Sequence, residues 1–188
     1  MKTEAGPCAR SGVRYVMIRA GILTVSDKGW RGEREDESGE AIRRVLVGKG
    51  VQIDRTEIVP DEVAAIQARL IAWADQDHLD LVLTTGGTGF SARDVTPEAT
   101  LPVLERQTPG ISEAIRAEGR KKTPRAILSR GVAGIRGRTL IVNLPGSTRA
   151  VEESLEVLFP ALFHGIEILK GETSECGREL EGAGRTKS

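Results

Sequence analysis

Apolar residues along the chain follow two alternating spacings. Short apolar runs that stop at polar residues or glycine predict strands at 18–25, 51–59 and 81–85. Apolar residues three or four positions apart predict helices between and after these strands. The expected helices run from 36 to about 49, from 61 through 73, from 96, from 111 to about 121, and from 148 through 169.

Two further apolar runs, at 131–135 and 139–144, flank an Arg-Gly-Arg turn and predict a hairpin. Elsewhere strands alternate with helices, which favours parallel pairing because a crossover helix returns the chain to the same end of the sheet. The fold class that we expect is α/β: a three-layer αβα domain with a mostly parallel sheet covered by helices on both faces.

Length and composition fit one domain with short extensions. The chain has 188 residues, of which 39% are hydrophobic and 29% charged, as is typical of globular proteins. We expect the domain at 18–170, an N-terminal extension at 1–17, and a flexible polar tail at 171–188. The two cysteines, Cys8 and Cys176, lie near opposite ends and indicate neither a disulfide framework nor a metal cluster.

Net charge and hydropathy limit the classes of partner that we expect. There are 27 basic and 27 acidic residues, so the formal net charge is zero, and aromatic residues make up only 3%. Without a basic field or stacking platforms, nucleic-acid binding is not expected. No apolar run approaches the length of a membrane span, and the first twenty residues lack the apolar block of a signal peptide. We therefore expect a cytoplasmic protein with no membrane partner.

A glycine-rich bend follows the strand predicted at 81–85. Glycines allow a tight turn with exposed backbone N–H groups, and neighbouring threonine hydroxyls add hydrogen-bond donors, so the bend suits a phosphate. After it, Thr96 followed by Pro97 is typical of a capped helix start, which would bring further amides. The phosphate-binding candidates are Thr84, Thr85, Gly86, Gly87, Thr88 and Gly89.

Two familiar phosphate loops do not match this bend. A Walker A loop requires a lysine that is missing, and a dinucleotide fingerprint requires a third glycine where Ala92 stands. Asp94 follows the bend, where its carboxylate would repel a bare phosphate, so it is more useful as a magnesium ligand. The alternative is a plain connecting loop with Asp94 bonded to nearby amides.

Other strand ends should meet the bend, because the carboxyl ends of parallel strands share one edge of a sheet. Asp61 follows the strand at 51–59, so we expect it beside the bend, and a second junction of strand, glycine and helix follows Asn143. Each position has a structural alternative: Asp61 as a helix N-cap, Ser26 and Asp27 as a turn, and Ser147 as a helix cap.

Several sequence blocks resemble those of a known family. In order along the chain they are 21–27, 36–39, 59–62, 84–89, 93–100, 128–130, 133–137 and 143–146. The same blocks in the same order occur in the Mog and MoaB-like proteins of molybdenum-cofactor biosynthesis and in the G domain of gephyrin, and the resemblance covers about residues 19–170.

The resemblance implies a homotrimer that uses Mg-ATP to transfer AMP to the terminal phosphate of molybdopterin, releasing pyrophosphate. It implies that Asp61 and Asp94 are the catalytic pair, which would hold or orient Mg²⁺. The nucleotide and pterin pocket would be completed by Ser26, Asp27, Asn143, Pro145, Gly146 and Ser147.

One departure keeps a second function open. Ser147-Thr148 follows the MoaB-like branch of the family, in which some members do not catalyse the transfer. The alternative is therefore a non-catalytic carrier or scaffold that binds the pterin. In either case the resemblance implies a possible hand-over to a molybdate-insertion protein.

Overall fold

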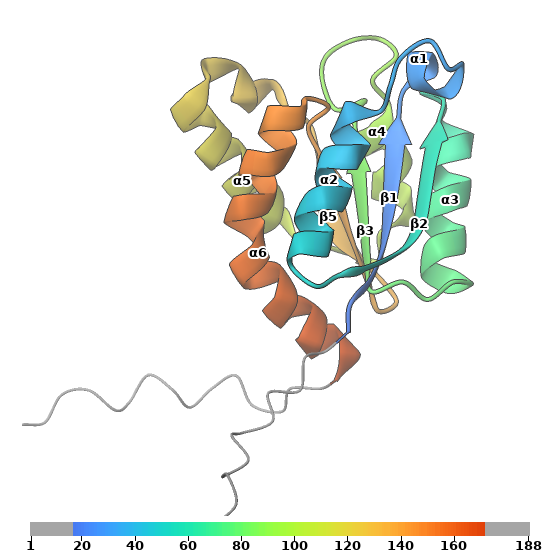
Figure 1. The fold of residues 1–188 in the computed structure, drawn as a ribbon, viewed down its shortest axis with the longest axis vertical. Coiled ribbons are helices and arrows are strands. Elements are labelled where there is room, and N and C mark those ends of the chain that lie inside the picture. Colours follow the sequence, from blue (N-terminus) through green and yellow to red (C-terminus); the bar gives the residue numbers. More distant parts are fainter. Residues whose placement is uncertain (1–16, 172–188) are drawn as a thin grey trace, which may run out of the picture.

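The computed structural model describes residues 17–171. Within that range six strands form one sheet in the order β2-β1-β3-β6-β5-β4 (Figure 1). The strands are β1 (Arg19–Val25), β2 (Gln52–Val59), β3 (Leu81–Thr85), β4 (Arg106–Gln107), β5 (Ala133–Arg136) and β6 (Thr139–Leu144). Strands β2, β1, β3 and β6 are parallel, while β5 and β4 continue the sheet in antiparallel pairing. The mostly parallel sheet and the hairpin are confirmed, and β4, which has only two residues, was not predicted.

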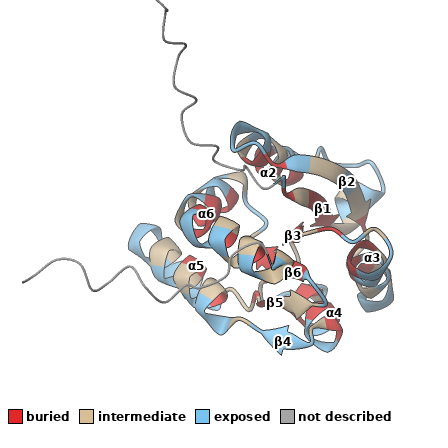
Figure 2. Ribbon diagram, turned by 90° about the horizontal axis from the view of Figure 1, so that it is seen from below, coloured by how far each residue is buried: buried red, intermediate tan, exposed pale blue. Residues whose placement is uncertain are grey.

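Helices cover both faces of this sheet, as expected for three layers (Figure 2). On one face lie α2, α5 and α6, and the opposite face is covered by α3 and α4. Each face has its own apolar core, and each fully buried aliphatic side chain there stabilises the fold by about 1.5–3 kcal/mol. The longer helices are α2 (Glu37–Gly48), α3 (Val63–Asp75), α5 (Pro109–Lys122) and α6 (Thr148–Lys170); the short ones are α1 (Asp27–Trp30), α4 (Thr96–Thr100), and the 3₁₀ turns η1 (Leu101–Val103) and η2 (Pro124–Leu128).

Polar side chains cap three of the α-helices. Asp36 caps α2 by accepting a hydrogen bond from Gly39 N at 2.8 Å. Ser147 caps α6 through Ala150 N at 3.3 Å, and Ser26 caps the short α1 through Gly29 N at 3.1 Å. The segment after β1 therefore contains one helical turn.

The cap predicted at Thr96 is wrong, and the alternative role of Asp61 as a cap is not observed. Val95, not Thr96, is the N-cap of α4, because the Thr96 hydroxyl donates to Gly86 O at 2.9 Å instead. Asp61 is not a cap either: Glu62 occupies the N-cap position of α3, and no side chain caps that helix. Both side chains instead form hydrogen bonds beyond the carboxyl ends of the strands, Thr96 with Gly86 O and Asp61 with Asp27 N.

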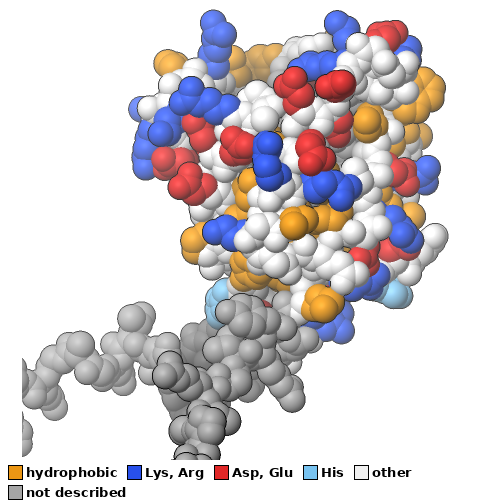
Figure 3. All heavy atoms as spheres, viewed as in Figure 1, with side chains coloured by type: hydrophobic (Ala, Val, Ile, Leu, Met, Phe, Trp, Pro, Cys, Tyr) orange, Lys and Arg blue, Asp and Glu red, His pale blue; other side chains and the backbone are white. Residues whose placement is uncertain are grey.

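Charged side chains of both signs are interspersed over the face formed by α2 and α6 (Figure 3). One pair, Arg44 and Glu152, joins the two helices at 3.1 Å. None of the helices in residues 17–171 is long and apolar enough to cross a membrane. Apart from Met17 and Gly171, the proposed extension and tail lie outside the described residues, as do Cys8 and Cys176.

Candidate active site

A polar cavity of 220 Å³ opens at the carboxyl ends of β1, β2 and β3. Asp61 reaches it from the end of β2, and Asp94 reaches it from the loop that follows the glycine bend. The two carboxylates that the sequence places near one another therefore line the same cavity. Its other predicted lining residues are Ser26, Thr85, Gly86, Gly87 and Gly146.

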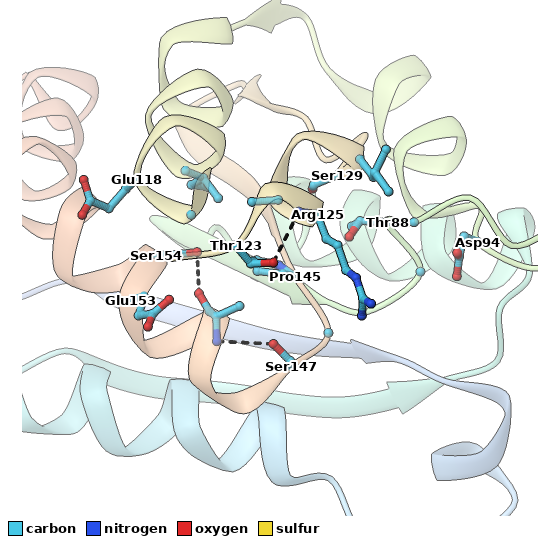
Figure 4. A pocket seen from close by; sticks show the side chains of 18 residues that line it. Thr88, Asp94, Glu118, Thr123, Arg125, Ser129, Pro145, Ser147, Glu153 and Ser154 are labelled. Atoms are coloured by element: carbon cyan, nitrogen blue, oxygen red, sulfur yellow. Dashed lines mark hydrogen bonds between the residues drawn. The ribbon is translucent and has the colours of Figure 1, made fainter. Parts of the chain in front are cut away.

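A second, larger cavity of 430 Å³ lies on the other side of the bend, and its walls are mostly apolar (Figure 4). The bend contributes Thr88 and Gly89 to it, and the turn before α6 contributes Pro145 and Ser147. Its remaining walls come from α5, η2 and the first turns of α6. We call these two spaces the polar cavity and the apolar cavity.

Three residues line both cavities: Gly87, Asp94 and Gly146. A ligand that occupies both spaces must therefore pass beside the bend and the Asp94 carboxylate. This geometry suits a substrate, or a pair of substrates, with an anionic group at the boundary and a less polar group in the apolar cavity.

The bend is built so closely that only glycine fits at two positions. Gly86 has φ 94° and Gly87 has φ 62°, a region that L side chains rarely adopt. A Cβ on Gly87 would come closer than 3.0 Å to Thr96 Oγ1 and to 3.1 Å from Asp61 Oδ1. Any side chain at position 87 would therefore press against Thr96 and Asp61.

Arg130 holds the bend from the side of η2. Its Nε donates to Gly89 O at 2.7 Å, its Nη2 donates to Asp94 O at 2.6 Å, and Nη1 pairs with Glu98. The backbone N–H of Arg130 also donates to Thr88 O at 2.9 Å. Because these carbonyl groups are bonded to Arg130, the bend and the Asp94 loop are fixed relative to each other.

Asp61 and Asp27 are joined by reciprocal hydrogen bonds. Asp61 Oδ2 accepts from Asp27 N at 2.8 Å, and Asp27 Oδ1 accepts from Asp61 N at 3.1 Å. Arg93 completes the group by donating from Nε and Nη2 to both carboxylate oxygens of Asp27, each at 2.9 Å. Since Arg93 directly precedes Asp94, this pairing connects the loops that carry Asp61 and Asp94.

The two aspartates of this group have opposite pKa shifts. The hydrogen bonds from Arg93 lower the pKa of Asp27. Burial, the largest cause, raises the pKa of Asp61, and the negative charges of Asp27 and Asp94 also favour its neutral form. A cation near Asp61 would relieve this repulsion.

The donor set fits Mg²⁺ bound together with a substrate. Residues 17–171 contain no group of three or more His, Cys, Asp or Glu side chains arranged around a metal position. Magnesium at phosphate-transfer sites needs no such cage, because it is usually held by one or two carboxylates together with water and substrate phosphates. Asp61 and Asp94 supply such a pair.

Three predicted binding residues line neither cavity: Asp27, which bonds to Asp61, and the buried residues Thr84 and Asn143. Thr84 and Asn143 are buried opposite each other on β3 and β6, and Asn143 Nδ2 donates to Thr84 Oγ1 at 2.9 Å and to Thr100 Oγ1 at 3.0 Å. Asn143 Oδ1 also accepts from Val132 N at 3.2 Å. The correction is physical: the strand register points both side chains into the interior, where they join β3, β6 and α4.

Asp27 and Thr85 form hydrogen bonds with other residues at or beside the cavities. Asp27 lines neither cavity but bonds Asp61, and the Thr85 hydroxyl, at the polar cavity, donates to Pro145 O at 2.8 Å. The wall formed by α5 and η2, including Arg125, was not predicted from the sequence. A run of three basic residues at the end of α5 was the only local signal near it.

Comparison with known proteins agrees with this geometry. Residues 21–164 match the family described as "Probable molybdopterin binding domain". The chain belongs to this family. The match includes Asp61, the glycine bend, Asp94 and the turn before α6, so both cavities lie within the part that the family shares.

Relatives within the molybdopterin-binding family match most of the chain. The molybdopterin adenylyltransferase of Helicobacter pylori (strain J99) is 43% identical over 157 residues, covering 82% of this chain and 89% of that protein. The molybdopterin adenylyltransferase of Escherichia coli K12 is 37% identical over 186 residues, covering 91% and 95%. The chain spans only 26% of the longer cinnamon protein of Drosophila melanogaster, with 44% identity over 161 residues.

Solved structures show the same fold. The molybdopterin biosynthesis enzyme MoaB of Thermus thermophilus has 55% sequence identity and a TM-score of 0.79, over 82% of this chain and 98% of that chain. A structure of MogA has 39% identity and a TM-score of 0.76, over 80% and 99%. The three-layer α/β fold is therefore confirmed.

Proposed function

We propose that this protein is a molybdopterin adenylyltransferase, which uses Mg-ATP to transfer AMP to the terminal phosphate of molybdopterin. The observation that carries the proposal is that Asp61 and Asp94 line one polar cavity beside the glycine bend. The adenylyltransferases of Helicobacter pylori and Escherichia coli, similar over most of this chain, support the same reaction.

The reaction needs no nucleophilic side chain. An oxygen of the molybdopterin phosphate attacks the α-phosphorus of ATP, a new P–O bond forms, and the bond from the α-phosphorus to the bridging oxygen breaks. The bonding electrons leave with pyrophosphate. The protein must align the two phosphates and stabilise the charge that they bring together.

Residues at and beside the boundary between the two cavities would align the phosphates and stabilise their charge. Asp61 and Asp94 would hold Mg²⁺, and bound magnesium would offset phosphate charge at the site of transfer. The backbone N–H groups of Gly86, Gly87 and Gly89 would receive phosphate oxygens. Arg93 would keep Asp61 in place through Asp27.

The two cavities suit different parts of the substrates. The polar cavity, with its aspartates and glycines, suits phosphates, whereas the mostly apolar walls of the larger cavity suit a flat ring system. As part of the same proposal, inferred from the resemblance, the protein is a cytoplasmic homotrimer that passes its product to a molybdate-insertion protein.

A second candidate function is a carrier or scaffold that binds the pterin without catalysis. Ser147 and Thr148, which begin α6 beside the two cavities, favour it because they follow the MoaB-like pattern. A carrier would retain the glycine bend but would not depend on either carboxylate.

An adenylylation assay separates the two functions. The protein is incubated with molybdopterin, Mg²⁺ and ATP labelled at the α-phosphate, and labelled pterin is measured. The adenylyltransferase produces labelled pterin, and Asp94→Asn abolishes it while the circular dichroism spectrum stays unchanged. Pterin binding without product would reject the enzyme and support the carrier.

A further inference from the structure

The lining of the apolar cavity includes one basic side chain, to which the proposed reaction has given no role. Arg125 comes from η2 and extends into the cavity, toward the side where Thr88, Asp94 and Ser147 lie (Figure 4). Within residues 17–171 its guanidinium has neither an ion-pair partner nor a hydrogen bond, while its backbone N–H donates to Thr123 Oγ1 at 3.3 Å.

The glutamates of the cavity do not require Arg125 as a counter-charge. Glu118 pairs with Lys121 at 2.6 Å, and Glu153 pairs with Arg149 at 2.9 Å. The third acidic lining residue, Asp94, accepts a hydrogen bond from Ser91 N at 2.8 Å. Arg125 therefore brings a positive charge that no described side chain takes up.

The segment that carries Arg125 is followed by the residue that holds the glycine bend. Residue Arg130, which follows η2 closely, bonds to Thr88, Gly89 and the backbone of Asp94. The amides of the bend and the guanidinium of Arg125 thus belong to connected walls of one cavity. An anion between them would contact both.

We propose that Arg125 binds a phosphate group of the substrate that fills the apolar cavity, and so determines specificity for phosphorylated ligands. The planar guanidinium matches two phosphate oxygens in a bidentate pair. Arg125 is exposed in the free protein, and a ligand that fills the cavity would displace water and leave phosphate as its partner. This inference rests on the proposed function, since the phosphate is that of the nucleotide or of molybdopterin.

The test compares Arg125→Gln and Arg125→Lys with Arg120→Gln in the full chain. Arg120 is a suitable control because it is exposed, lies in the last turn of α5, and lines neither cavity. Its substitution removes the same charge from the same region. Circular dichroism should show all three variants folded, because neither arginine side chain makes a hydrogen bond or an ion pair within residues 17–171.

Calorimetry with AMP, pyrophosphate and adenosine measures binding, and steady-state kinetics measures KM for ATP and for molybdopterin. Arg125→Gln should weaken binding of a phosphate ligand, or raise the corresponding KM, by roughly 10- to 100-fold, the usual range for a charged hydrogen bond. Arg125→Lys should lose less, Arg120→Gln should change little, and adenosine affinity should stay the same. Weaker AMP binding and a higher KM for ATP identify the nucleotide phosphate, whereas a higher KM for molybdopterin alone identifies the pterin phosphate.

The inference is overturned if Arg125→Gln leaves every phosphate affinity and both KM values within about twofold of wild type, or if AMP and adenosine lose affinity equally. Normal turnover with such a result rejects the role of Arg125 and keeps the proposed function. If the wild type makes no adenylylated pterin, but Arg125→Gln binds AMP or pyrophosphate more weakly than the wild type does, the enzyme is rejected and the phosphate contact is kept. If wild type neither binds a phosphate ligand nor turns over, both are rejected.

Discussion

Gly87→Ala tests whether the glycine bend is as tightly constrained as the structure shows. The substitution incurs two costs. A non-glycine residue at φ 62° costs about 1–2 kcal/mol of folding free energy. The added methyl group also meets Thr96 Oγ1 closer than 3.0 Å and Asp61 Oδ1 at 3.1 Å, and overpacking of this kind costs about 1–3 kcal/mol more. We expect a total destabilisation of about 2–5 kcal/mol from these two costs together, and a displaced Asp61.

Gly32→Ala is the matched control. Gly32 has φ 72°, but a Cβ there has no other atom within 4 Å, so only the backbone cost applies. Urea unfolding followed by circular dichroism measures both variants against wild type, and the adenylylation assay reports turnover of the folded protein. Gly87→Ala should be the less stable variant and should lose turnover, whereas Gly32→Ala should keep it. Equal stability of the two variants, together with normal turnover, would refute the close contact of the bend with Thr96 and Asp61.

Three further predictions concern neighbouring residues. Gly89→Ala places a Cβ 2.9 Å from Asp94 Oδ2, and Gly89 does not have a positive φ, so the backbone is not strained. Turnover should therefore fall about 10- to 100-fold with little change in the urea midpoint. Unchanged turnover would contradict the placement of Asp94. Arg93→Gln removes the partner that lowers the pKa of Asp27 below its ordinary 3.8. The variant should be less stable than wild type above about pH 4, and this difference in the free energy of unfolding should vanish as acid protonates Asp27. A difference in stability that does not depend on pH would argue against the pair. Asn143→Ala should lower the free energy of unfolding by about 1–3 kcal/mol without changing the KM for ATP, and a raised KM with normal stability would restore Asn143 to the binding site.

Local patterns were enough to predict the frame of the site. The strand β3 is buried along its whole length, and its apolar residues predict that directly. Because parallel strands place their carboxyl ends at one edge, the order of elements also predicted that Asp61 and Asp94 would approach the glycine bend.

Contacts between distant residues could not be predicted in the same way. Thr96 before Pro97 has the local pattern of a cap, yet its hydroxyl bonds to Gly86, ten positions away. Asn143 lies near the end of an apolar strand, beside the glycine turn, as a ligand-binding residue would, but its register opposite Thr84 buries it. Such partners are set by packing between strands, which one segment of sequence does not contain.

The apolar cavity was missed for a different reason. Its wall includes η2, a 3₁₀ turn of five residues without helical periodicity, and Arg125 within it has no distinguishing neighbours in the sequence. The cavity forms where α5, η2 and α6 come together beside the bend, and both α6 and the bend are distant from η2 in the sequence. That the Arg125 guanidinium has no partner in the described part of the chain can be seen only once the residues around it are known.

The proposed reaction requires Asp61 and Asp94 to act on one magnesium ion in the polar cavity. A crystal structure with Mg²⁺ and a non-hydrolysable ATP analogue shows directly whether they do. We predict one cation about 2.1 Å from an oxygen of each carboxylate and from a phosphate oxygen. A cation bound without these aspartates, or an analogue whose phosphates lie away from the glycine bend, would contradict the proposed reaction.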